Sequence, residues 1–355
     1  MPKAELSNLR IEWERVRRIL IVRLRSIGDT VLSTPSISQI KSLAPHVEID
    51  ILLEDWVAPL LEDHVDVNRV IIAPKSVLGR MALAFRLRKS RYDAVFNFHG
   101  GTTSAILSLA AGANAVFGYS SYRNSFVYNK KCPSSAEFWK RSTTHSAEQQ
   151  CALVGYSGLA IETCPKTCLS VSAQSRAFVG DLLTSKLMGF EPGDFVLIHP
   201  AAAYETKRWS AKRFAETADF ISESGFIPIL LVTNAEAGIA DEIVATAKHE
   251  IPVITNLPLR HVAALASEAR LFLGNDSGMA HIAAAVGTPT VVVFGSSNRD
   301  HWHPWTDAPW GIVYKPFDCQ PCPGDECRKF GEPRCIQEIE TSAVVDEISR
   351  VLAQS

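Results

Sequence analysis

The sequence predicts an α/β protein with two doubly wound, Rossmann-like lobes that face a central cleft. Short apolar runs alternate with amphipathic stretches along both halves of the chain, a pattern typical of parallel sheets covered by helices. At 355 residues the chain is long enough for two domains that each bury a core. The stretch from Cys164 to about Val171 contains Pro165 and shows no clear periodicity. We therefore expect the boundary there, with lobes at 1–165 and 166–355.

In the N-terminal half, the apolar run at 18–24 predicts a buried strand. The turn at 26–29 leads into one predicted helix, whose apolar face carries Val31, Leu32, Ile37, Ile40 and Leu43. Further strands are expected at 47–53, 70–73 and 92–98, with a helix at 77–88. Residues 119–144 are polar and aromatic without periodicity, which predicts a long, substrate-facing loop.

The C-terminal half repeats the alternation of strands and helices. Strands are expected at 195–199, 227–233, 271–273 and 290–294. Helices are expected at about 211–222, 237–248, 259–268 and 279–286, with Gly225 and Gly287 placed to end two of them. Doubly wound sheets bind ligands at the carboxyl ends of their strands, so polar residues just after the strands are candidates for function.

The composition is that of a soluble globular protein, with 46% hydrophobic residues and a formal net charge of -2. A slightly acidic chain argues against nucleic-acid binding over its whole surface. No apolar run reaches the roughly 18 residues needed to cross a bilayer, and the N-terminus lacks a secretory pattern, so we expect a cytoplasmic location. A basic cluster either contacts anionic lipid at the inner membrane or is a solvated helix end. It comprises Arg15, Arg17, Arg18, Arg23 and Arg25.

One segment in the C-terminal half combines a strand, a tight turn, a helix of small residues and a second strand. Backbone N–H groups of Ser277, Gly278 and Met279 open this helix, where they would bind an anion such as a diphosphate. Asp276 would repel phosphate, so it would accept hydrogen bonds from sugar hydroxyls or order the loop, and His281 would donate to a phosphate oxygen. The alternative is that Asp276 or Ser277 caps the helix and that His281 is a satisfied polar neighbour.

A second polar segment, from His199 to Ser210, leaves a predicted strand and enters a predicted helix. Lys207 would neutralise a departing diphosphate, the role that a metal ion has in other enzymes, and Thr206 would add a hydroxyl donor. Alternatively, Lys207 and Arg208 are solvated charges before a helix.

In the N-terminal half, Gly28 and Asp29 follow the first predicted strand. An ionised carboxylate at this position can take a proton from an acceptor hydroxyl, although a simple helix cap is the alternative. The turn containing His99 and Gly100 again connects a predicted strand to a helix, and it would hold an acceptor anion.

Four late cysteines, with the spacing C-x2-C-x4-C-x7-C, are a weak candidate for a zinc site, and free thiols are the alternative. They are Cys319, Cys322, Cys327 and Cys335. No other metal and no cofactor is expected. The chain lacks GxxxxGK[ST], GxGxxG after the first strand, and a D-x-D pair in the cleft motifs, which argues against kinase, dehydrogenase and metal-held diphosphate chemistry. The tryptophans Trp302, Trp305 and Trp310 indicate loop packing, with a base-stacking platform as the alternative.

Taken together, Ile19 to Pro35, Thr206 to Trp209 and Asn275 to His281 resemble motifs of glycosyltransferase family nine, the ADP-heptose:lipopolysaccharide heptosyltransferases. The resemblance implies a GT-B fold, an acceptor held by the N-terminal lobe, ADP-heptose held by the C-terminal lobe, and inversion without metal. It implies that Asp29 is the base and adds Glu236 near the donor ribose.

The implied partners are ADP-heptose and a lipid-linked oligosaccharide acceptor, with peripheral contact at the inner membrane. Residues 119–165 match nothing specific, so the acceptor sugar is not implied. Two other readings stay open. One is a transferase or epimerase for another nucleotide sugar, and the other is a catalytically silent protein that binds sugar nucleotides or glycolipids.

Overall fold

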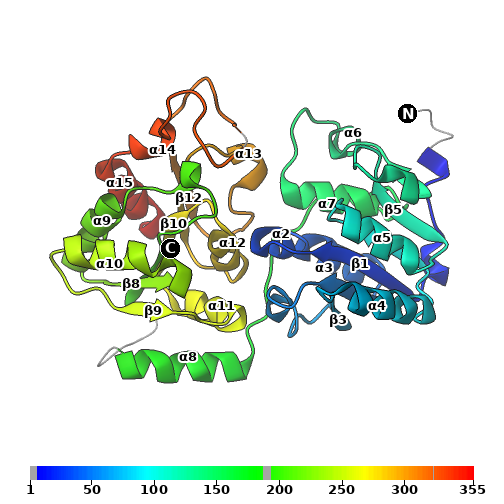
Figure 1. Ribbon diagram of the computed structural model, residues 1–355. Coiled ribbons are helices and arrows are strands. Elements are labelled where there is room, and N and C mark those ends of the chain that lie inside the picture. The colour runs from blue at the N-terminus through cyan, green and yellow to red at the C-terminus, as the bar shows by residue number, and fades with distance from the viewer. Residues whose placement is uncertain (1–5, 187–192, 323) are drawn as a thin grey trace. The chain divides into compact units, whose positions relative to one another are not determined.

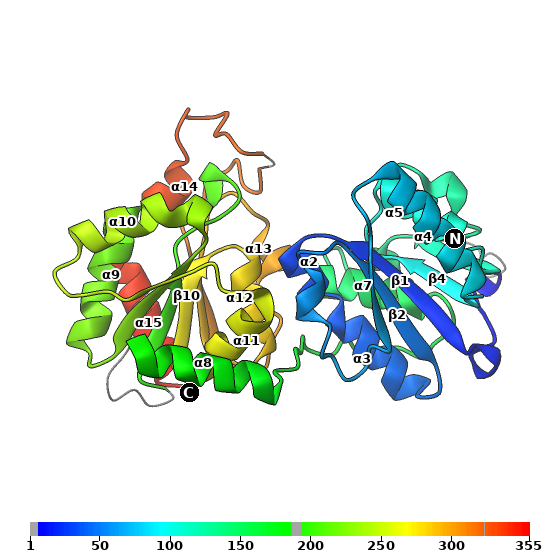
Figure 2. The same cartoon turned by 60° about the horizontal axis from the view of Figure 1, so that its bottom comes forward.

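The computed structural model describes residues 6–186, 193–322 and 324–355. The chain divides into two compact units, Met1–Ser170 and Val171–Ser355, and each unit contains a six-stranded sheet. All recorded strand pairs are parallel. Helices cover both faces of each sheet (Figure 1 and Figure 2). The predicted fold class, two doubly wound α/β units, is confirmed.

The first unit has the strand order β3-β2-β1-β4-β5-β6. Its strands are β1 (Arg18–Leu24), β2 (Glu48–Leu53), β3 (Arg69–Ile72), β4 (Ala94–Asn97), β5 (Ala115–Tyr119) and β6 (Lys130–Cys132). Its helices are α2 (Ile27–Val31), α3 (Thr34–Leu43), α4 (Val77–Lys89), α5 (Thr102–Ala110), α6 (Ser135–Trp139) and α7 (Ser146–Gly155). Single 3-10 turns lie at η1 (Trp13–Arg15), η2 (Ala58–Leu60) and η3 (Ser125–Val127).

Two expectations for this unit were wrong. The single helix after residue 26 is two helices, because α2 ends at Val31 and α3 starts afresh at Thr34. Pro35 has no N–H to continue the first helix and suits the first turn of the second. The predicted loop at 119–144 contains β6 and α6. The edge strand β6 escaped prediction because Lys-Lys-Cys has no apolar alternation, and its pairing with β5 uses backbone groups alone.

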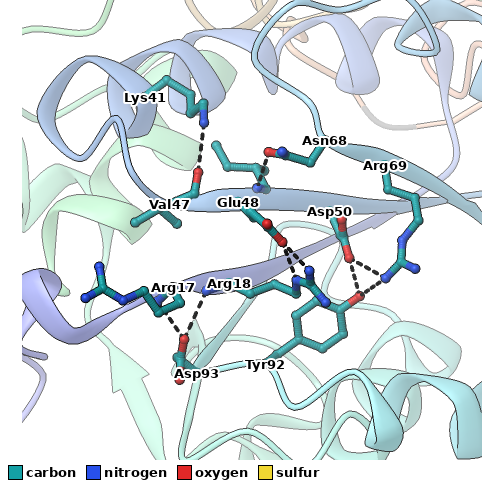
Figure 3. Close-up of polar contacts among 11 residues, drawn as sticks. Arg17, Arg18, Lys41, Val47, Glu48, Asp50, Asn68, Arg69, Tyr92 and Asp93 are labelled. Atoms are coloured by element: carbon teal, nitrogen blue, oxygen red, sulfur yellow. Dashed lines mark hydrogen bonds and ion pairs between the residues drawn. The ribbon is translucent and has the colours of Figure 1, made fainter.

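Polar contacts join the strands of the first unit near their amino ends, as Figure 3 shows. Arg18 Nε donates to Glu48 Oε2 over 2.7 Å, which links β1 to β2. The buried Asp50 carboxylate accepts from Arg69 Nη2 at 2.6 Å and from Tyr92 Oη at 2.7 Å. Burial, and then the hydrogen bond to Asp50, raises the pKa of Tyr92 to about 12. The amino ends therefore hold satisfied structural contacts and leave the carboxyl ends for function.

The second unit has the strand order β12-β11-β10-β7-β8-β9. Its strands are β7 (Phe195–His199), β8 (Ile227–Val232), β9 (Val253–Thr255), β10 (Leu271–Asn275), β11 (Thr290–Phe294) and β12 (Trp310–Tyr314). Its helices are α8 (Ala173–Lys186), α9 (Ala211–Glu223), α10 (Ala237–Thr246), α11 (Leu259–Glu268), α12 (Gly278–Ala285), α13 (Arg299–Trp302), α14 (Arg334–Gln337) and α15 (Thr341–Leu352), with 3-10 turns η4 (Glu205–Lys207) and η5 (Asn234–Glu236). The predicted strands and helices of this half are present, and Gly225 and Gly287 follow α9 and α12 with φ of 87° and 84°.

Both sheets have one topology, since the first strand of each unit pairs with the fourth. In the first unit β1 lies between β2 and β4, and in the second β7 lies between β8 and β10. The chain reverses its direction of winding at β1/β4 and at β7/β10. Doubly wound sheets bind ligands at the carboxyl ends of the strands beside such points. Among the described residues, no helix combines the length and apolar character that a membrane crossing requires.

Candidate functional site

The predicted residues of the first unit lie at its β1/β4 point. Asp29 is on α2, directly after β1, while His99 and Gly100 follow β4, and Val22 of β1 is in register with Asn97 of β4. The Asp29 carboxylate forms an ion pair with the guanidinium of Arg23. Asp29 therefore does not cap α2, whose N-cap residue is Ser26.

Arg23 is a residue that the sequence analysis assigned wrongly. Expected as part of a solvated or lipid-binding cluster, it is 7% exposed and bonds both Asp29 and the carbonyl of Phe98. The backbone turns sharply just after it, with φ of 62° at Leu24 and 79° at Ser26, values that non-glycine residues rarely adopt. An arginine inside an otherwise apolar strand, six residues before an aspartate, was the available signal.

The turn after β4 is held by one side chain. Asn97 Oδ1 accepts hydrogen bonds from the backbone N–H groups of His99 at 2.9 Å and Gly100 at 2.8 Å. Gly100 has a φ of 73°, and a Cβ there would lie 2.8 Å from the ring of Tyr122, so the turn requires glycine. Tyr122 comes from the 119–144 stretch that was expected to face substrate.

His99 is neutral at ordinary pH. Burial, followed by the positive charges of Arg23 and Arg25, lowers the pKa of His99 to about 4. Its buried Nδ1 has no hydrogen-bond partner in the described part of the chain. A neutral imidazole can donate or accept a hydrogen bond, and the positive charge beside the turn comes from Arg23 and Arg25 rather than from His99. Gly28 is buried within α2, and its carbonyl accepts from Leu32 N at 2.8 Å.

In the second unit, the structure joins two of the predicted residues at the β7/β10 point. Lys207 Nζ lies 2.8 Å from Asp276 Oδ2 and 5.6 Å from the centroid of the Tyr204 ring. The side chain of Lys207 is 21% exposed and that of Asp276 is 6% exposed. Lys207 is thus a partly buried, paired cation, and the reading of it as a solvated charge was wrong. Asp276 does not cap α12.

Asn275 links the two segments that carry this pair. Its Oδ1 accepts from Trp209 N at 3.1 Å, and its Nδ2 donates to the carbonyl of Pro200 at 2.7 Å. Asn275 is fully buried, so both halves of its amide need partners. The segment after β7 is thereby fixed against the turn after β10.

The start of α12, where an anion site was expected, is partly open to solvent. Ser277 is the N-cap residue, but its hydroxyl caps no backbone N–H and lies 3.5 Å from His199 Nδ1. Gly278 and Met279, the first residues of α12, are partly exposed, whereas His281 is buried. The opening N–H groups of the helix therefore adjoin a region that a ligand can reach.

His199 is a neighbour of the site that the sequence analysis did not select. It ends β7, it is buried, and its Nε2 lies 3.9 Å from Glu236 Oε2. Burial lowers the pKa of His199 more than the Glu236 carboxylate raises it. Glu236 Oε2 also accepts from the backbone N–H of Thr233 at 2.8 Å and from its hydroxyl at 2.9 Å. Glu236 is thus held in place by the turn after β8.

Thr206 has a different surrounding from the one expected. Its hydroxyl donates to the carbonyl of Gly324 at 3.0 Å and accepts from Ser296 Oγ at 2.9 Å, and the residue is 1% exposed. In the structure it therefore anchors the cysteine-rich segment to the segment before α9.

Lys207 also lines a cavity of about 430 Å³. Other lining residues come from the loop after β11, including Ser297, Asn298 and Trp302. Ser297 Oγ is buried with no partner among the residues described, so it can bond a ligand. This loop carries no motif by which it could be selected from the sequence, and Trp302 was expected to pack within a loop. A larger cavity in the first unit, about 710 Å³ and bounded by Arg10, Glu137 and Tyr156, contains none of the predicted site residues.

The four late cysteines gather around one small cavity together with Phe317 and Phe330. All four are free thiols. Burial, and then the neighbouring thiols, raises the pKa of Cys335 to about 11. Within the described residues, no group of three or more His, Cys, Asp or Glu side chains is arranged to hold a metal ion.

Comparison with known proteins places the chain in context. The model of glycosyltransferase family 9 (heptosyltransferase) matches residues 80–330, which include Lys207 and Asp276 but not Asp29. The chain is 27% identical over 302 residues to lipopolysaccharide heptosyltransferase 3 of Escherichia coli, covering 80% of this chain and 85% of the relative. It is 22% identical over 342 residues to lipooligosaccharide heptosyltransferase 2 of Campylobacter jejuni, and the match covers 93% of this chain and 96% of the relative.

Solved structures share the fold. A glycosyl transferase family 9 protein of Veillonella parvula superimposes with a TM-score of 0.82 at 20% identity, over 98% of this chain and 100% of that one. The ADP-heptose lipopolysaccharide heptosyltransferase II of E. coli superimposes with a TM-score of 0.80 at 21% identity, over 95% of this chain and 99% of that one. These likenesses show the GT-B fold.

Proposed function

Because the chain belongs to glycosyltransferase family 9 (heptosyltransferase), we propose that it transfers a heptose from ADP-heptose to a sugar of the lipopolysaccharide inner core. The names of the relatives support heptose as the transferred sugar and lipopolysaccharide as the acceptor. The observation that carries the proposal is the Lys207–Asp276 pair, which lies at the β7/β10 point beside an open cavity. The proposed location is the cytoplasm, at the inner face of the inner membrane.

In the proposed mechanism, the second unit binds the donor. The diphosphate of ADP-heptose bonds the N–H groups that open α12, where the helix dipole also favours negative charge. As the bond between the anomeric carbon and the phosphate oxygen breaks, ADP keeps the electron pair and gains negative charge. Lys207 stabilises that charge. Asp276, which holds Lys207 in place, accepts hydrogen bonds from the sugar hydroxyls.

The first unit supplies the base. Asp29 removes the proton from the acceptor hydroxyl while that oxygen forms a bond to the anomeric carbon, so one displacement inverts the configuration. The ion pair with Arg23 fixes the direction of the carboxylate. The neutral His99 and the tight turn at Gly100 bind the acceptor beside it. No metal ion is assigned to any step.

The experiment that tests the function is incubation of the protein with ADP-heptose and a series of truncated core acceptors, with the products read by mass spectrometry. We expect one acceptor to gain the mass of one heptose while an equal amount of ADP appears. Conversion of the donor without any acceptor would indicate an epimerase instead. Tight binding of ADP-heptose with no product on any acceptor would show that the protein is a binding protein rather than a transferase.

A further inference from the structure

Helix α4 buries one side and exposes large apolar residues on another. Leu83 and Leu87 pack in the core of the first unit, each 1% exposed. Four large apolar side chains of the same helix face away from that core: Val77 is 72% exposed, Leu78 79%, Met81 65% and Phe85 63%. Residues four apart lie on one face of a helix, so Val77, Met81 and Phe85 form a stripe with Leu78 beside it. We call these four residues the α4 surface.

Neighbouring elements add exposed apolar residues. Helix α5 packs against α4 on the same face of the sheet (Figure 2), and it exposes Ile106 at 59% and Leu109 at 55%. The 3-10 turn η3 contacts α5 and exposes Phe126 at 76%. Single exposed apolar residues are common, but a cluster over adjacent elements marks an interaction site.

The α4 surface lies within a basic segment. Residues 75–91 contain no Asp or Glu and six basic residues: Lys75, Arg80, Arg86, Arg88, Lys89 and Arg91. Arg86, Arg88, Lys89 and Arg91 are exposed at the carboxyl end of α4, and Lys89 Nζ lies 4.5 Å from the centroid of the Phe85 ring. Lys75 pairs with Asp55, and the other five basic residues give this segment a strong local excess of positive charge in a chain with a net charge of -2.

We propose that the α4 surface docks on an anionic phospholipid bilayer. The apolar side chains would enter the headgroup region while the basic side chains contact lipid phosphates. A second copy of the chain fits less well, because a symmetric contact through this face would oppose like charges. Docking through this face would hold the first unit, which carries the proposed acceptor turn of His99 and Gly100, at the membrane that holds a lipid-linked acceptor. Only this last step rests on the proposed function.

The proposal moves the membrane contact away from the N-terminal arginines suggested by the sequence. Arg15 pairs with Glu12, Arg18 pairs with Glu48, and Arg23 pairs with Asp29. Those three side chains are paired with acidic groups of the chain itself, and between residues 6 and 25 no large apolar side chain is exposed.

The test is flotation of the full chain with vesicles, which needs no activity. We expect binding to vesicles of phosphatidylglycerol and phosphatidylethanolamine, and little binding to phosphatidylcholine vesicles. Met81→Glu/Phe85→Glu and Arg86→Ala/Lys89→Ala should each weaken binding by roughly tenfold or more, and high salt should weaken it further. The matched control is Val65→Glu, because Val65 is 85% exposed in the same unit but outside the α4 surface.

Equal vesicle binding by wild type and both double variants would overturn the proposal, as would an equal loss in Val65→Glu. Sedimentation of wild type as a dimer, with Met81→Glu/Phe85→Glu a monomer, would also overturn it by assigning the face to self-association. Turnover with an acceptor that lacks acyl chains should stay at the wild-type level in the double variants. That readout separates failure of membrane docking from failure of the proposed transferase.

Discussion

Both residues proposed to handle charge in the reaction meet an opposite charge inside their own unit. Asp29 pairs with Arg23 in the first unit, and Lys207 pairs with Asp276 in the second. Burying charged groups has a desolvation cost that the attraction within the pair only partly offsets, so such pairs stabilise a fold weakly. Their clearer effect is to hold each side chain in one direction, which a reaction with strict geometry needs.

Replacing Asp29 by Asn removes the base while keeping the size of the side chain. We expect kcat to fall by about 10²–10⁴-fold, the usual contribution of general-base catalysis, with little change in ADP affinity. Steady-state transfer assays and calorimetric ADP titration measure the two quantities. A variant that kept more than roughly a tenth of wild-type turnover would show that another group takes the proton.

Replacing Lys207 by Ala removes the cation proposed to stabilise the departing ADP. We expect kcat to fall by roughly 10²–10³-fold, as for loss of one preorganised electrostatic contact, together with weaker ADP binding. The matched control is Arg208→Ala, because Arg208 Nε donates to the carbonyl of Ala202 at 2.8 Å, so its guanidinium is bound to backbone. If both variants lost the same activity, the effect would come from general loss of positive charge.

At the scale of helices and strands, the parts of the site that could be predicted are those within a single strand–turn–helix segment. A buried strand followed by a polar turn and a helix is a local pattern, so residues 28–29, 99–100 and 276–281 could be chosen from the sequence. Contacts between strands are not local. The position of His199 between Ser277 and Glu236 and the approach of Ser297 to the Lys207 cavity depend on strand order and on loops that carry no periodic signal.

The turn between β4 and α5 should be sensitive to a single methyl group. In Gly100→Ala the positive φ and the contact with Tyr122 both oppose a Cβ, so we expect a loss of about 1–3 kcal/mol in the free energy of unfolding. The KM for the acceptor should rise more than the KM for ADP-heptose. Gly180→Ala, within α8 and with no atom near a Cβ, should be neutral or stabilising. Denaturant titration compares them, and equal stability of the two variants would contradict the strain argument.

At the scale of the molecule, the sequence predicted two α/β units because the alternation of strands and helices occurs twice. It did not predict that both sheets have the same strand order, since order depends on which strands pair after the crossovers form. It also missed β9 and β12, the two edge strands of the second sheet. The shared order gives each unit one point where the winding reverses, which is where the proposed function puts one substrate per unit.

Buried neutral histidines should make the protein sensitive to acid. Burial lowers the pKa of His64 and His99 in the first unit and of His199 in the second. The unfolded chain, with a histidine pKa of about 6.5, binds these protons more readily, so their contribution to stability is present above that pH and is lost as the pH falls. For His99 the window extends down to about 4. We expect the free energy of unfolding of the wild type to decrease from pH 7 to pH 5. In His99→Gln this decrease should be smaller. An unchanged slope in His99→Gln would show that its burial does not contribute.

The assignment of the donor to the second unit predicts an unequal response to ADP. Each unit has its own sheet and core, so differential scanning calorimetry should resolve two transitions. Phe117→Leu in the first unit and Phe214→Leu in the second, both fully buried, should each lower the temperature of one transition and so identify it.

A ligand stabilises the state that binds it by about 2.7 kcal/mol at a hundred times its Kd. ADP should therefore raise the transition of residues 171–355 and leave that of residues 1–170 nearly unchanged. A larger shift in the first unit would reverse the assignment of donor and acceptor.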